Sequence, residues 1–297
     1  MLLETTLRPA PPYSLAQSAR LASDATRFFR DGVLTAALEA NGAPALARAW
    51  QRADGDVAVR IEGERPEAAL ERFRFILAID DSHAEFLLRF RDDRLVGPAI
   101  RAHPGRRPLR TATVTHALLK AVCGQLIQAR AARLLEAKLV RRLSAEHEGL
   151  RLPPGRETFA ALSPAQLAPL GLVARKAGAV VRVSRELDLE RLRDAPSGAA
   201  VARIERERGL GPWSAGMVSL YGLGRFDHGL VGDLGLVKLL SAERGRWVET
   251  EETRALLAPY GEWAGLASVY ILSRAPAAKR APAGRERGSR REWSRAR

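Results

Sequence analysis

The chain has almost no cysteine, since Cys123 is the only one among its 297 residues. One thiol cannot close an intramolecular disulfide, and it cannot supply the four thiolates that hold an iron–sulfur cluster. The sequence therefore excludes a fold that is stabilised by disulfides and excludes an iron–sulfur protein. It favours a reducing compartment such as the cytoplasm.

Long apolar runs are also lacking. No stretch reaches the roughly 18 apolar residues that a membrane-spanning helix needs. The first residues, MLLETTLRPAPPY, contain a glutamate and no cationic stretch followed by an apolar one, so they do not have the pattern of an export signal. We expect a protein that is not exported and that has no membrane partner.

Histidine is scarce, and its positions do not form a metal-ligand pattern. None of the five histidines stands at zinc-ligand spacing from another or from the cysteine, so the sequence indicates no zinc site. The histidines are His83, His103, His116, His147 and His228.

Acidic residues are fewer than basic ones, 34 against 48, so the formal net charge is +14. Such an excess favours a polyanionic partner. Half of it lies in the stretch from Arg274 to Arg297, which has nine Lys or Arg and two Glu. Residues 276–297 are rich in Ala, Pro, Gly and Arg, so we expect a disordered tail. It would act either as a solubilising segment or as an electrostatic arm for DNA.

Two structured regions are predicted, which makes the fold class α+β. In residues 1–100, Asn41-Gly42 and Asp54-Gly55 are hairpin signals between extended segments, and residues 57–61 alternate as a half-buried strand does. A helix is expected from Pro66. This pattern predicts a small antiparallel sheet packed against helices, whereas residues 101–275 show amphipathic helical segments with short connections and predict an all-α domain.

The stretch GLGPWSAG, from Gly209 to Gly216, predicts a tight hairpin between two helices. Gly209 can end the first helix in a left-handed conformation, and Pro212 suits the first position of the second helix. The backbone of Gly209, Leu210 and Gly211 would then lie beside unpaired helix N–H groups, where a phosphate can approach. An ordinary turn between two helices is the alternative.

Asp233 stands directly before an apolar helical segment, in GDLGL. A helix N-cap is a common role for aspartate and explains this position without any chemistry. A hairpin with Gly-Pro-Trp followed by such an aspartate is much rarer than either feature alone.

Together these motifs resemble the helix–hairpin–helix–Gly/Pro–Asp DNA glycosylases, in particular the bacterial 3-methyladenine DNA glycosylase II type. The family hairpin reads Leu-Pro-Gly-Ile-Gly-Pro-Trp-Thr-Ala, and here it is ERGLGPWSA, with Arg208 at the usual proline. An upstream family segment with Leu-Gly-Gln is matched by AVCGQLIQARAAR. The resemblance extends to about residue 275, and it implies that the N-terminal sheet domain is similar to half of a TATA-binding protein.

The resemblance implies a role for each matching residue. Asp233 would support departure of a damaged base from its sugar after the base has left the helical stack. Leu126 would be the wedge that fills the gap, and a core leucine is the alternative. Gln125 would lie near the flipped base or the opposite strand, and a buried polar residue that ends a helix is the alternative.

The base pocket implied by the resemblance is aromatic. Trp213 and Trp263 would line it, and electron-rich rings suit a cationic alkylated base; the alternative is that both belong to the core. Met217 stands where one branch of the family has tyrosine, and Ala264 stands where that branch often has arginine. Gly232 replaces the first of two family aspartates.

Cofactors are not required by this resemblance. The family holds a monovalent cation, Na⁺ or K⁺, on carbonyl oxygens around the hairpin, which here belong to Glu205, Glu207 and Gly209. The bifunctional relatives carry a lysine where this chain has Trp213, so a Schiff base at that position is excluded. The expected protein is a monomeric, monofunctional glycosylase that acts on double-stranded DNA with damaged bases, in the nucleoid of a bacterial cytoplasm.

Two other functions fit the sequence less well. A noncatalytic DNA-binding module would keep the hairpin and lose the reaction, and the replacements at Arg208 and Gly232 are consistent with such a loss. A helical scaffold without any DNA role would explain neither the basic balance nor the hairpin.

Deleting residues 274–297 should weaken nonspecific binding to duplex DNA and flatten its salt dependence, because the deletion removes nine cations. Titrations of a labelled duplex at several salt concentrations measure both quantities. A deletion that leaves the slope of log K against log salt unchanged would contradict the electrostatic arm.

Overall fold

The fold is described from a computed structural model, which places residues 1–20 and 22–273. The basic tail expected at 276–297 lies outside the described residues. Within them, no helix has the length and apolar character to cross a lipid bilayer.

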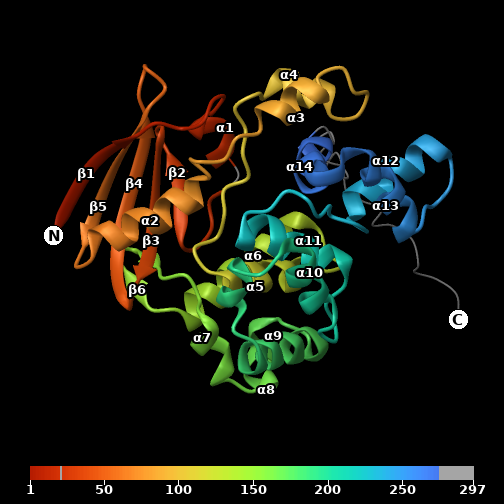
Figure 1. The fold of residues 1–297 in the computed structure, drawn as a ribbon. Helices are drawn as coiled ribbons and strands as arrows, with labels where there is room; N and C mark the ends of the chain where they lie inside the picture. The colour runs from red at the N-terminus through yellow and green to blue at the C-terminus, as the bar shows by residue number, and fades with distance from the viewer. Residues whose placement is uncertain (21, 274–297) are drawn as a thin grey trace, which may run out of the picture.

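The N-terminal part is a five-stranded antiparallel sheet with strand order β1-β5-β4-β3-β2. The hairpin between β3 and β4 turns at Asn41 and Gly42, which have φ of 51° and 77°, as the Asn-Gly signal predicts. Helix α2 (Pro66–Leu77) lies across one face of the sheet (Figure 1) and buries Phe73 and Ile76 there. The strands are β1 (Leu2–Leu7), β2 (Arg27–Arg30), β3 (Val33–Ala40), β4 (Ala43–Gln51) and β5 (Val57–Gly63).

A central helical group follows, as the second half of the sequence predicts. Its core is formed by α5, α9 and their neighbours and consists mostly of leucine, valine and alanine, with Phe159 fully buried among them. The elements are α5 (Val114–Gly124), α6 (Ala129–Leu143), α7 (Arg156–Ala160), α8 (Pro164–Leu167), α9 (Ala174–Glu186), α10 (Ser197–Glu205), α11 (Pro212–Val218) and the π-helical turn η3 (Ser219–Leu223).

A third group combines the last helices with two early ones. Phe86 and Ile100 share a core cluster with Leu236, Leu257 and Tyr270. Within the expected N-terminal domain of residues 1–100, the part from Phe86 to Ile100 thus packs with the C-terminal helices. The helices are α3 (Ala84–Arg89), α4 (Gly97–Ala102), α12 (Leu234–Arg244), α13 (Thr250–Leu257) and α14 (Ala264–Ser273), with the 3₁₀ turn η4 (Ala258–Trp263).

Short elements lie within the first two groups. Between β1 and β2 stands α1 (Leu15–Ala19), and between helices of the central group stand β6 (Glu146–His147), β7 (Leu150–Arg151), η1 (Ala168–Leu170) and η2 (Leu189–Arg193).

Arg107 joins the segment that follows α2 to the loop that precedes α5, and its side chain is fully buried. Its guanidinium donates to the carbonyl oxygens of Ala78 (2.8 Å) and Ile79 (3.1 Å), and its Nε donates to Nδ1 of His83 (3.2 Å). Nε2 of His83 lies 3.1 Å from the Pro104 carbonyl oxygen. Since Nδ1 accepts a hydrogen bond, the imidazole is neutral in this arrangement.

Burial, together with the positive charge of Arg107, lowers the pKa of His83 from 6.5 to about 4. The unfolded chain therefore binds a proton more readily than the folded one between these values. We expect the free energy of unfolding to fall by up to about 3 kcal/mol through this group as the pH drops from 6.5 to 4. Urea unfolding of wild type and His83→Gln over this range measures it, because the variant lacks this contribution.

The half-buried His147 provides the matched control, and His147→Gln should follow the wild-type pH profile. Parallel profiles for wild type and His83→Gln would show that His83 does not carry the effect.

Candidate active site

The helix–hairpin–helix predicted around GLGPWSAG is present. Helix α10 ends at Glu205, Gly209 has φ of 93°, and Pro212 opens α11. Leu210 is buried in the central core and anchors the hairpin, so only its backbone faces outward. A side chain added at Gly211 would meet nothing within 4 Å, which leaves the backbone open to a ligand.

Asp233 caps the N-terminus of α12, as its sequence position predicts. Its Oδ1 accepts a hydrogen bond from the Gly235 N–H (2.7 Å), and its Oδ2 accepts one from Nε1 of Trp213 (2.9 Å). The residue is half-buried. The carboxylate is thus held at both oxygens, and each oxygen keeps a lone pair for another partner.

The residue before it, Gly232, explains one departure from the family pattern. Its φ of 80° lies in the left-handed region, and a Cβ added there would lie 3.2 Å from Cγ2 of Thr250. Its N–H donates to Oγ1 of Thr253 (2.8 Å). Glycine at this position therefore favours the left-handed turn into α12.

Trp213 joins the hairpin to Asp233 and to α5. Besides the bond to Asp233, its ring packs on the last residue of α5, where a Cβ added to Gly124 would lie 2.6 Å from Cη2. Gly124 is therefore needed for this contact. The tryptophan is half-buried, so it is neither a full core residue nor a free surface ring.

Leu126 stands two residues after Gly124, in the turn between α5 and α6. Its side chain is 96% exposed and its φ is 59°. The alternative of a core leucine is therefore wrong, and the role of a wedge stays a prediction.

Gln125 faces the hairpin. Its Nε2 donates to the Gly209 carbonyl oxygen (2.8 Å) and to Oγ of Ser214 (3.0 Å), while Nζ of Lys176 donates to the Gln125 carbonyl oxygen (2.7 Å). These bonds fit the alternative of a polar residue that ends a helix, and they occupy both amide protons. Contact of Gln125 with a flipped base stays a prediction.

Met217 and Tyr221 extend the row that begins at Trp213. The three follow at steps of four residues along α11 and η3 and are all half-buried, between neighbours that are mostly buried. Burial raises the pKa of the Tyr221 phenol, the positive charge of Lys120 opposes this, and the negative charge of Asp233 adds to it. Tyr221 and Lys120 were missed in the sequence, where the four-residue spacing was the available signal for Tyr221.

Trp263 lies in η4 and packs against the third core cluster, whereas Trp213 and Met217 pack against the central one. Its ring stacks on Phe226, with centroids 6.0 Å apart, and lies 6.0 Å from Phe86 in the third core cluster. Its place in a base pocket stays a prediction. Ala264 is buried, and its Cβ lies 3.4 Å from where a Cβ on Gly229 would stand, so this packing leaves little room for an arginine.

Two of the three carbonyls named for a cation already accept hydrogen bonds. The Glu207 carbonyl accepts from the Leu210 N–H (2.9 Å), and the Gly209 carbonyl accepts from Gln125. A carbonyl oxygen has a second lone pair, so these bonds are compatible with a Na⁺ or K⁺ ion. The cation on Glu205, Glu207 and Gly209 stays a prediction.

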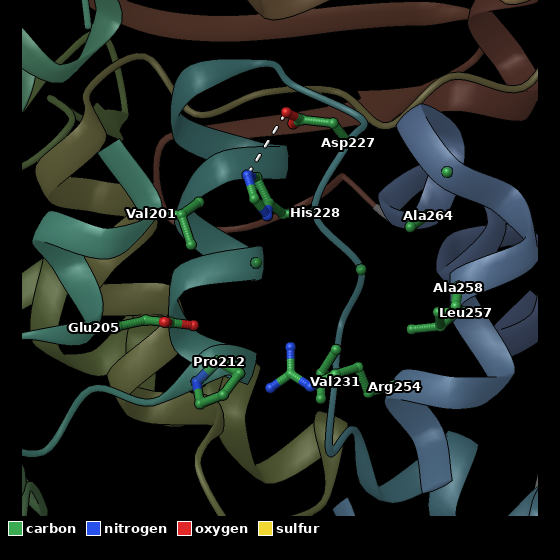
Figure 2. Close-up of a pocket in the computed structure, with 13 residues that line it drawn as sticks. Val201, Glu205, Pro212, Asp227, His228, Val231, Arg254, Leu257, Ala258 and Ala264 are labelled. Atoms are coloured by element: carbon green, nitrogen blue, oxygen red, sulfur yellow. Dashed lines mark ion pairs between the residues drawn. The ribbon is translucent and has the colours of Figure 1, made fainter. Parts of the chain in front are cut away.

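A separate cavity of about 200 Å³ lies between α11 and α13 (Figure 2). Figure 2 shows Pro212 on one side of it and Leu257 on the other, and Gly216 and Arg254 also line it. His228 lies here, with its Nε2 3.6 Å from Oδ2 of Asp227. Neither Asp233 nor Trp213 lines this cavity, so we do not assign the reaction to it.

The fold as a whole, a five-stranded sheet followed by helical groups, is similar to the fold of solved DNA glycosylase structures. A 3-methyladenine DNA glycosylase from Archaeoglobus fulgidus is 24% identical, with a TM-score of 0.74 over 91% of this chain and 97% of that one. An 8-oxoguanine glycosylase/lyase from Clostridium acetobutylicum, in complex with double-stranded DNA, is 15% identical, with a TM-score of 0.73 over 92% and 96%. No protein-family model and no protein of curated function matches the chain.

Replacing Gly232 by alanine should destabilise the protein by about 1–2 kcal/mol, because a residue with a Cβ is strained in the left-handed region. Urea unfolding measures the loss. The matched control is Gly178→Ala in α9, where a Cβ meets nothing within 4 Å and a helix favours alanine. Equal stability of the two variants would show that the turn tolerates other residues.

Proposed function

We propose that this chain is a DNA glycosylase that hydrolyses the N-glycosidic bond of alkylated purines, such as 3-methyladenine and 7-methylguanine, in double-stranded DNA. The observation that carries the proposal is the half-buried Asp233 carboxylate, which Trp213 and Gly235 hold directly beside the hairpin. A fold shared with DNA glycosylases supports it.

Binding begins at the backbone of the hairpin. The N–H groups at the start of α11 have no partner within their own helix, and the helix dipole favours an anion there. The open space above Gly211 lets a DNA phosphate approach. The exposed Leu126 can then enter the duplex and occupy the space of a base that has turned out of the stack.

Asp233 acts on the sugar. As the C1′–N bond lengthens, positive charge develops at C1′, and a fixed carboxylate stabilises that charge. The same carboxylate can accept the proton of the attacking water. Because its two hydrogen bonds already orient it, little reorganisation is needed during the reaction.

The proposed reaction is monofunctional. Trp213 occupies the position where bifunctional relatives hold a lysine, and its Nε1 is committed to Asp233. An indole cannot form a Schiff base, so the product would be an abasic site in an unbroken strand.

The substrate range rests on the hairpin resemblance and on the similarity to the Archaeoglobus protein, which is described as a 3-methyladenine DNA glycosylase. We propose a monomer that works without a cofactor in the bacterial cytoplasm, on DNA of the nucleoid. Occupancy of the hairpin by Na⁺ or K⁺ belongs to the same proposal.

Replacing Asp233 by asparagine should lower the rate of base release from alkylated duplex DNA at least about 100-fold, because the charge that stabilises C1′ is lost. Asparagine keeps the shape and a hydrogen-bond acceptor, so the variant should still bind duplex DNA. Chromatography of released 3-methyladenine and 7-methylguanine measures excision, and a gel-shift titration measures binding.

Release by Asp233→Asn at the wild-type rate would contradict the catalytic assignment. Binding by wild type without any release would favour the noncatalytic DNA-binding module instead.

A further inference from the structure

Lys120, which the proposed reaction does not use, lies beside the row formed by Trp213, Met217 and Tyr221. Nζ of Lys120, on α5, is 6.0 Å from the ring centroid of Tyr221. It lies 3.3 Å from Oε2 and 3.5 Å from Oε1 of Glu136, and its side chain is 22% exposed. Both distances are long for a charge-assisted bond, so the ammonium keeps N–H groups for a further acceptor.

A buried cluster holds this ammonium in place. Glu136 is almost fully buried and accepts a hydrogen bond from Nε2 of His116 (3.0 Å). Asp24 lies close by and pairs with Arg27 (3.3 Å). Two cations already balance the two carboxylates, so a metal ion would have to displace one of them, and the cluster is better explained as a rigid support for Lys120.

The geometry of α5 and α11 places Lys120 beside the row formed by Trp213, Met217 and Tyr221. The two helices run antiparallel, because Gly124 meets Trp213 while Ala117 approaches Gly222. Lys120 is one turn before Gly124 and therefore lies on the same face of α5. Trp213 and Tyr221 are eight residues apart in α11 and η3, so the row extends over about two helical turns.

The two kinds of damaged purine place different demands on such a site. A cationic alkylpurine leaves with the electron pair of the C1′–N9 bond and becomes neutral, so it needs no proton. An uncharged purine such as hypoxanthine leaves as an anion unless a donor neutralises it. A positioned acid or hydrogen-bond donor typically contributes 10²–10⁴-fold to such a step.

We propose that Lys120 is a catalytic residue that donates a proton to a ring nitrogen or carbonyl oxygen of an uncharged leaving base. In this step the C1′–N9 bond breaks and its electron pair goes to the base. The base takes a proton from Lys120, water adds its hydroxyl to C1′, and the proton that the water releases passes by way of Asp233 and solvent back to the lysine. The assignment rests on the proposed glycosylase function.

The test compares two substrates in one protein. Single-turnover excision is measured for wild type and Lys120→Met on duplexes that contain either hypoxanthine or 7-methylguanine. We expect the rate on hypoxanthine to fall about 100-fold or more, and by at least about 30-fold more than the rate on 7-methylguanine. Lys120→Arg keeps the charge but does not give up a proton, so it should leave most of the loss on hypoxanthine in place.

Two further variants secure the comparison. Lys120→Met leaves Glu136 short of a cation, so Lys120→Met combined with Glu136→Gln removes both charges and should show the same selectivity. Lys138→Met changes an exposed lysine on α6 and should leave both rates unaltered.

Equal losses on the two substrates, or a wild type that releases 7-methylguanine but no hypoxanthine, would overturn the role of Lys120 and leave the glycosylase proposal standing. A wild type that releases neither base would overturn both.

Discussion

The hydrogen bond from Trp213 to Asp233 is the interaction on which the site depends. The tryptophan belongs to the first turn after the hairpin, and the aspartate is the first residue of the C-terminal helical group. Because the same indole packs on Gly124, one side chain sets the positions of three segments. A smaller residue at 213 would leave the carboxylate without its lateral support, and a residue with a side chain at 124 would displace the ring.

Gln125 provides a second connection of the same kind. Its amide binds the hairpin at Gly209, and its carbonyl oxygen is held by Lys176, so the exposed turn at Leu126 is fixed from both sides. A phosphate bound by the hairpin and a base stack that meets Leu126 would therefore act on one rigid unit. The loop before Asp233 is equally constrained, because Gly216 and Gly265 allow its backbone to pass closely between α11 and α14.

Much of this could be predicted from the sequence, because it depends on local chemistry. The hairpin, the N-cap at Asp233 and the Asn-Gly turn each follow from what glycine, proline, aspartate and asparagine do to the backbone next to them. The pairing of β1 with β5 and the packing of Phe86 with the last helices could not be predicted, because they join residues far apart in the chain. The hydrogen bonds from the Gln125 amide to the hairpin could not be predicted for the same reason, since its partners there are more than 80 residues away in the chain.

A role for Lys120 could not be predicted from the sequence, because a lysine in an amphipathic helix is normally a solvated residue. Its proposed role follows from its position beside Tyr221 of η3. On our proposals, the row from Trp213 to Tyr221 has a carboxylate near one end and an ammonium near the other. Breaking a glycosidic bond develops positive charge on the sugar and negative charge on an uncharged base, so fixed charges of opposite sign match that separation before it occurs. Half-buried rings and a thioether lie between them, and the lower local dielectric there strengthens both interactions.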